Sequence, residues 1–223
     1  MPTQAIMIEV DGQGTVSGLW QTPAGPAKAC LALAHGAGAG MTHKAMAATA
    51  DGLAERGVAV LRYQFPYMEK GGKRVDPPPV AHATVRAAVA EARRRAGDLA
   101  LFAGGRSFGG RMTSQTQASA AMDGVRGLVF FGFPLHPAGK PSIERAAHLA
   151  KVSVPMLFLS GTRDALAELS LLEPETAKLG AMATLMLFED ADHSFHVPAK
   201  TGRKDAEVMA EMLDKTVAWM GGH

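Results

Sequence analysis

The chain has 223 residues, of which 47% are hydrophobic and 20% are charged, a balance typical of a globular protein and unlike that of a disordered or fibrous one. This length suffices for one domain with a sizeable core, and we expect residues 1–223 to form a single domain. The formal net charge is +2, with Lys and Arg scattered along the chain, which argues against a nucleic-acid partner.

Cys30 is the only cysteine, which excludes an internal disulfide and makes a reducing compartment the natural setting. The N-terminus lacks a basic region followed by an apolar core, and no stretch approaches the roughly 20 apolar residues of a membrane span. We therefore expect a cytoplasmic protein that has no membrane partner. Oligomeric state is left open by the sequence.

Strands and helices are predicted to alternate along most of the chain, after an initial pair of strands joined by a turn at residues 11–14. The predicted strands are residues 5–10, 15–21, 29–34, 58–62, 99–103, 127–131, 154–160 and 184–188. The predicted helices are residues 43–56, 80–96, 142–150 and 205–220. A further helix is predicted from the glycines after Ser107 to about Ala121, and residues 166–179 are predicted to contain helical stretches interrupted by Pro174. Residues 63–79 are expected to be irregular. This alternation predicts an α/β fold with a mostly parallel sheet, helices on both faces and ligands at the carboxyl ends of the strands.

Ser107 lies where the apolar run 99–103 gives way to Gly104-Gly105-Arg106-Ser107-Phe108-Gly109-Gly110 and then to a helical pattern. Gly105 and Gly109 match Gly-x-Ser-x-Gly, in which small neighbours permit a strained strand-to-helix turn that presents a serine hydroxyl above the sheet. The motif also occurs by chance in glycine-rich loops, so the strand before it and the helix after it carry the prediction.

A serine hydroxyl needs a base to take its proton and a carboxylate to orient that base. Asp164 follows the predicted strand 154–160, and His193 follows the strand 184–188. Three loops at the carboxyl ends of strands, in the order Ser, Asp, His, match the α/β-hydrolase arrangement rather than that of the chymotrypsin or subtilisin types.

A negative oxygen forms when a serine attacks a carbonyl, and backbone N–H groups can stabilise it. The N–H of Phe108, directly after the serine, is one candidate donor. The glycine-rich loop His35-Gly36-Ala37-Gly38-Ala39-Gly40 is expected to supply the other from Ala37, and His35 to stabilise this loop.

The chain resembles the α/β-hydrolases over nearly its whole length, as a small member without a large cap domain. It is similar to the dienelactone-hydrolase-like proteins and to a hydrolase-like family related to a subunit of a eukaryotic histone acetyltransferase (nonspecific lethal) complex. The residues behind the latter resemblance are 35–38, 65–68, 104–111 and 132–137. The resemblance implies Ser107 as nucleophile, His193 as general base and acid, Asp164 as its orienting carboxylate, and Ala37 and Phe108 as oxyanion donors. Dienelactone hydrolases proper use a cysteine nucleophile where this chain has serine.

Simpler interpretations exist for these residues. Ser107 could lie in an ordinary tight turn, Asp164 could cap a helix, and His193 could be a solvated loop histidine. Asp190, Asp192, His193 and His196 could form a metal cluster, although their crowding in one loop argues against it.

Substrate contacts are less sharply indicated. The aromatic residues Tyr63, Phe65 and Tyr67 could line a substrate wall or pack a long loop, and His136 could face the pocket or be structural. The basic residues Lys70, Lys73 and Arg74 suggest an anionic substrate, but a solvated loop explains them equally well.

The sequence as a whole predicts a serine hydrolase that cleaves a carboxylic ester or thioester of a small-molecule acyl substrate, without a cofactor or metal. Two alternatives remain open: a protein-interaction module on a hydrolase scaffold, and an acyltransferase that uses an alcohol or amine in place of water.

Overall fold

The computed structural model describes residues 1–223 and contains one eight-stranded sheet in the order β1-β2-β4-β3-β5-β6-β7-β8. The first two strands pair in an antiparallel manner, β2 pairs antiparallel with β4, and all other neighbours are parallel. The strands are β1 (Thr3–Val10), β2 (Gly14–Gln21), β3 (Ala29–Ala34), β4 (Val58–Tyr63), β5 (Ala100–Arg106), β6 (Val125–Phe131), β7 (Met156–Gly161) and β8 (Ala183–Phe188). The predicted α/β class and mostly parallel sheet are confirmed.

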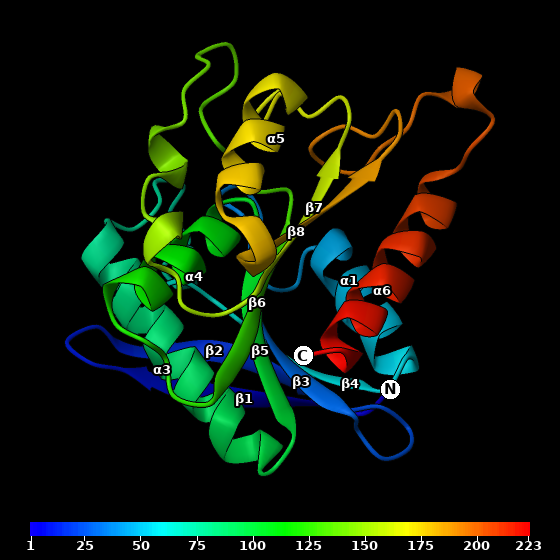
Figure 1. Ribbon diagram of the computed structural model, residues 1–223. Coiled ribbons are helices and arrows are strands. Elements are labelled where there is room, and N and C mark those ends of the chain that lie inside the picture. Colours follow the sequence, from blue (N-terminus) through cyan, green and yellow to red (C-terminus); the bar gives the residue numbers. More distant parts are fainter.

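Helices cover both faces of this sheet (Figure 1). The helices are α1 (Lys44–Glu55), α2 (Pro66–Glu69), α3 (Pro78–Ala96), α4 (Phe108–Ser119), α5 (Leu169–Lys178) and α6 (Asp205–Gly221), with short 3-10 turns at Glu144–Ala146, Leu149–Lys151, Gly180–Met182 and Ala199–Thr201. One face carries α1 and α6, and the other carries α3, α4 and α5. The chain has no separate cap domain.

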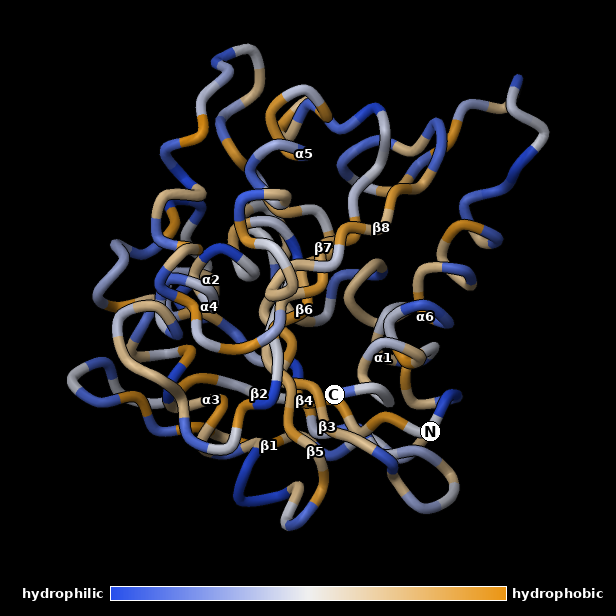
Figure 2. The backbone as a smooth tube through the Cα atoms, in the orientation of Figure 1, coloured by the Kyte–Doolittle hydropathy of each residue, from blue (hydrophilic) through white to orange (hydrophobic).

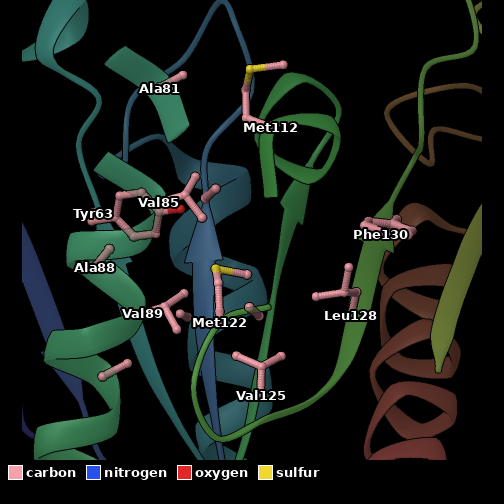
Figure 3. Packing of buried hydrophobic residues seen from close by; sticks show 14 of the residues in the cluster. Tyr63, Ala81, Val85, Ala88, Val89, Met112, Met122, Val125, Leu128 and Phe130 are labelled. Carbon is pink, nitrogen blue, oxygen red and sulfur yellow. The ribbon is translucent and has the colours of Figure 1, made fainter. Parts of the chain in front are cut away.

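The strands from β3 to β7 are hydrophobic almost throughout, as expected for strands covered on both faces (Figure 2). Two buried clusters result, one on each face. Side chains from α3 and α4 pack on the sheet in the larger cluster, where Val85 of α3 lies beside Tyr63 of β4 (Figure 3). The smaller cluster holds Met46 and Leu53 of α1 against Met212 and Leu213 of α6.

Three local predictions need correction. Helix α5 runs through Pro174 without interruption, because Leu172 and Thr176 are buried on its inward side and offset the backbone hydrogen bond that proline lacks. The segment 63–79 contains the short helix α2, which begins at Pro66, and proline is favoured at the first helical position. The predicted helix 142–150 is two separate 3-10 turns. None of the helices combines the length and the apolar character needed to cross a bilayer.

Candidate active site

Ser107 lies at the sharp turn between β5 and α4. Its backbone has a φ of 48° and a ψ of −114°, a region that residues other than glycine rarely adopt. The turn also brings α4 against the end of β3. A Cβ on Gly105 would lie 2.5 Å from the carbonyl oxygen of Ala34, and one on Gly109 would lie 2.5 Å from that of His35. The glycines of Gly-x-Ser-x-Gly are therefore required by this close packing.

His193 and Asp164 form a hydrogen-bonded line with Ser107, from loops that follow β8, β7 and β5. Nε2 of His193 lies 2.9 Å from the Ser107 Oγ, and Nδ1 lies 2.7 Å from Oδ2 of Asp164. Because an ionised carboxylate only accepts hydrogen bonds, Nδ1 carries the proton, which leaves the Nε2 lone pair free to accept from the serine hydroxyl. The Asp164 side chain is fully buried, whereas that of His193 is 24% exposed, so the imidazole is accessible to a bound molecule.

The glycine-rich loop after β3 lies beside the serine, since a Cβ on Gly36 would be 3.8 Å from the Ser107 Cβ. The N–H of Ala37 donates to no other group in the protein. Phe108 begins α4, and the first N–H groups of a helix have no intrahelical acceptor. Two N–H groups are thus free in the segments that flank the hydroxyl.

Buried hydrogen bonds hold this loop in place. His35 donates from Nδ1 to the Gly36 carbonyl at 2.7 Å and accepts the Phe65 N–H at Nε2 at 3.1 Å. Burial lowers the pKa of His35 to about 4, which keeps the ring neutral and fixes this pattern of donor and acceptor. The Tyr67 hydroxyl donates to the Ala37 carbonyl at 2.8 Å, and burial raises the pKa of Tyr67 to about 12, so the hydroxyl keeps its proton.

A cavity of about 710 Å³ opens over Ser107 and His193. Its walls come from the glycine-rich loop, from the first turns of α1 and α6, and from residues at the ends of β5 and β6. The side chains other than Ser107 and His193 that line it are His43, Lys44, Met46, Arg106, Phe131, Leu166, Ser194, His196, Asp205 and Met209 together with several alanines. Its volume falls in the range of small-molecule binding sites.

Four residues predicted to contact substrate lie outside this cavity, which corrects the expected substrate wall. Tyr63 and Phe65 are 1% and 0% exposed and belong to the larger buried cluster. The Tyr67 hydroxyl is bonded to the glycine-rich loop. His136 is 0% exposed, where its Nδ1 donates to the Pro137 carbonyl and its Nε2 contacts Glu168. These large side chains fill the interior rather than line the cavity.

Most of the residues that line the cavity were not predicted from the sequence. Arg106 could have been found, because it directly precedes Ser107. Lys44 and Met209 could not, since their meeting depends on how α1 and α6 pack together on one face of the sheet.

The metal interpretation of the loop 190–196 gains no geometric support, because no group of three or more His, Cys, Asp or Glu side chains is arranged to hold an ion. His196 instead pairs with Asp205 at 2.9 Å. Asp192 accepts the backbone N–H groups of Ser194 and His196 through Oδ1, which shapes the turn that carries His193.

Solved structures with the same fold cover nearly the whole chain. An α/β serine hydrolase homologue from Coxiella burnetii is 18% identical, with a TM-score of 0.78 over 96% of this chain and 98% of that one. A lidless α/β serine hydrolase from Xanthomonas campestris is 20% identical, with a TM-score of 0.74 over 98% and 96%. A dienelactone hydrolase from Anabaena variabilis is 18% identical, with a TM-score of 0.78 over 100% and 98%.

The family model described as an alpha/beta hydrolase domain matches residues 27–221. This range begins just before β3 and includes the glycine-rich loop, Ser107, Asp164 and His193. With the sheet order and the strand-to-helix turn at Ser107, the match shows that the chain belongs to the α/β-hydrolase family.

Proposed function

We propose that the protein is a serine hydrolase that cleaves a carboxylic ester or thioester through an acyl-Ser107 intermediate. The observation that carries the proposal is the continuous line from the Asp164 carboxylate through the His193 imidazole to the Ser107 hydroxyl, with contacts of 2.7 and 2.9 Å. This line opens into a cavity large enough for a small acyl compound.

In the first half of the reaction, His193 Nε2 takes the proton of the Ser107 hydroxyl as Oγ attacks the substrate carbonyl. The N–H groups of Ala37 and Phe108 stabilise the resulting oxyanion, a contribution that is typically worth about 100- to 1000-fold in rate for each donor. Asp164 stabilises the imidazolium. Collapse of the tetrahedral species breaks the bond to the leaving group, which receives the proton from Nε2.

In the second half, His193 takes a proton from a water molecule, and the hydroxide formed attacks the acyl-serine. The acid leaves as Ser107 Oγ regains its proton from Nε2. An alcohol or amine in place of this water would give acyl transfer by the same steps, and product analysis with added acceptors separates the two outcomes.

Labelling with a fluorophosphonate probe tests the proposal, because the probe reacts with activated serines and demands little of the substrate pocket. We expect the intact protein to be labelled, and Ser107→Ala and His193→Ala to lose labelling. Ser114→Ala is a matched control, since Ser114 Oγ also lies 2.7 Å from a histidine nitrogen, that of His148, but within α4 and outside the cavity. This variant should still be labelled.

Absence of labelling in the folded intact protein would overturn the hydrolase proposal and favour an interaction module on the hydrolase scaffold. Labelling that persists in Ser107→Ala would place the reactive nucleophile elsewhere. Circular dichroism of each variant establishes that the fold is retained.

A further inference from the structure

Arg106 directly precedes the nucleophile and lines the same cavity. Its guanidinium is largely enclosed: Nη1 is shielded from solvent and has no hydrogen-bond partner. None of the ion pairs of the protein includes this residue. A buried guanidinium is costly unless it is paired, so an unpaired one at the wall of a cavity is a position where a ligand could supply the missing partner.

The groups around Arg106 leave its Nη1 without a hydrogen-bond partner. The Phe195 ring lies beneath the guanidinium, with 5.8 Å between its centroid and Cζ. Burial lowers the pKa of the Arg106 guanidinium, whereas the negative charge of the nearby Asp192 carboxylate acts in the opposite direction. Asp192 uses its Oδ1 for two backbone N–H groups and makes no ion pair with Arg106.

Lys44 and Asp205 are the other Lys, Arg, Asp or Glu side chains of the cavity lining. Lys44 lies at the first turn of α1 and is in none of the ion pairs of the protein. Asp205, the single carboxylate of the lining, is paired with His196. A guanidinium presents parallel N–H donors that match a carboxylate.

We infer that Arg106 is a specificity-determining residue that binds a carboxylate carried by the substrate, so that the preferred substrates are esters or thioesters with a second, anionic carboxylate. This inference rests on the proposed function for the identity of the reaction, but anion binding itself can be measured without turnover. The carboxylate could belong to the acyl part or to the leaving group, and two pairs of substrates distinguish these sources.

For the acyl part, kcat/KM is compared between mono-4-nitrophenyl glutarate and 4-nitrophenyl pentanoate. For the leaving group, 4-acetoxybenzoate is compared with 4-acetoxybenzamide. We expect the intact protein to prefer the charged member of one pair. In Arg106→Gln this preference should fall by about 10- to 100-fold, mainly through KM, as expected for loss of a charge-assisted hydrogen bond, and Arg106→Lys should retain part of it.

Arg111→Gln is the matched control. Arg111 also has a buried nitrogen without a partner, Nε, and also lies over a phenylalanine ring, that of Phe108 at 5.8 Å, but it does not line the cavity. Its substitution should leave the ratio between charged and neutral substrates unchanged. An equal preference for charged and neutral substrates in the intact protein, or an unchanged ratio in Arg106→Gln, would overturn the inference.

Calorimetric titration of glutarate into Ser107→Ala and into the Ser107→Ala, Arg106→Gln double variant gives a second readout. We expect binding only when Arg106 is present, and equal binding by both variants would overturn the inference. Failure of the proposed function would appear instead as an intact protein that binds glutarate but is not labelled by the fluorophosphonate.

Discussion

The Asp164 carboxylate shows how one side chain serves the backbone and the site together. Its Oδ2 accepts from His193, while its Oδ1 accepts the N–H of Leu166 at 2.8 Å. The sequence suggested these two roles as alternatives, an orienting carboxylate or a local cap, and the structure shows both contacts at once. Because the backbone contact fixes the carboxylate, the imidazole is held in one orientation by a group that is itself rigid.

Tyr67 is expected to act as a positioning residue for the Ala37 amide. Replacing it with phenylalanine removes the hydroxyl that donates to the Ala37 carbonyl, and the loop should then sample positions in which the neighbouring N–H no longer points at the oxyanion. We expect kcat for an ester to fall by about 3- to 10-fold, the equivalent of one ordinary hydrogen bond, with KM within about twofold of the original value.

Tyr63→Phe is the control for this prediction. Tyr63 is also a buried tyrosine, with a hydroxyl near Thr113, but it makes no contact with the glycine-rich loop. Both substitutions should cost a similar amount of stability, whereas only Tyr67→Phe should lower kcat. Equal kcat values for the two variants would show that Tyr67 contributes packing alone.

At the scale of elements, the approach of α4 to the end of β3 sets the position of Ser107. Gly109 lies in the first turn of α4, where alanine would ordinarily be the better helix former. A Cβ there would nevertheless lie 2.5 Å from the His35 carbonyl oxygen and 2.7 Å from the Ala34 Cβ. We expect Gly109→Ala to lower the free energy of unfolding by about 1–3 kcal/mol, as overpacking does.

Urea denaturation of Gly109→Ala beside Gly25→Ala measures this effect. A Cβ on Gly25 would meet no atom within 4 Å, so the control should stay within about 0.5 kcal/mol of the original protein, as surface substitutions usually do. A Gly109→Ala variant as stable as the control would mean that α4 can shift away from β3 at little cost.

The elements that sequence predicted best are those whose signal is local. Continuous apolar runs located β3 and β4 to within one residue, and glycines after the helical patterns marked the ends of α1 and α3 at Gly57 and Gly97. The strand-to-helix context likewise predicted where Ser107 turns. The roles of Tyr63 and Phe65 could not be predicted, because an apolar aromatic residue in a long segment looks the same whether it faces a cavity or the core.

At the scale of the whole molecule, the sheet order assembles the site from distant parts of the chain. The strands β5, β7 and β8 lie within one parallel part of the sheet, so the loops after them emerge at one edge and bring Ser107, Asp164 and His193 together. The loop after β3 joins them because β3 lies next to β5. Chain order predicted that these three side chains meet, but the cavity walls depended on α1 and α6 sharing a face (Figure 1).

The stability of the whole fold should depend on pH through the buried His35. Its pKa is lowered from 6.5 to about 4 by burial, so between these values the unfolded chain binds a proton that the folded protein does not. The contribution of His35 is therefore fully present above pH 6.5 and lost as the pH falls toward 4, at a cost of roughly 3 kcal/mol. Urea unfolding across this range should show a smaller loss of unfolding free energy on acidification for His35→Gln than for the original protein.

His196 provides a control of opposite sign, because its pKa is raised by the hydrogen bond to Asp205. Its contribution to stability is therefore present at low pH and lost as the pH rises. His196→Gln should therefore not reduce the acid loss, and a His35→Gln variant that loses stability as steeply as the original protein would show that His35 does not stay neutral in the folded state.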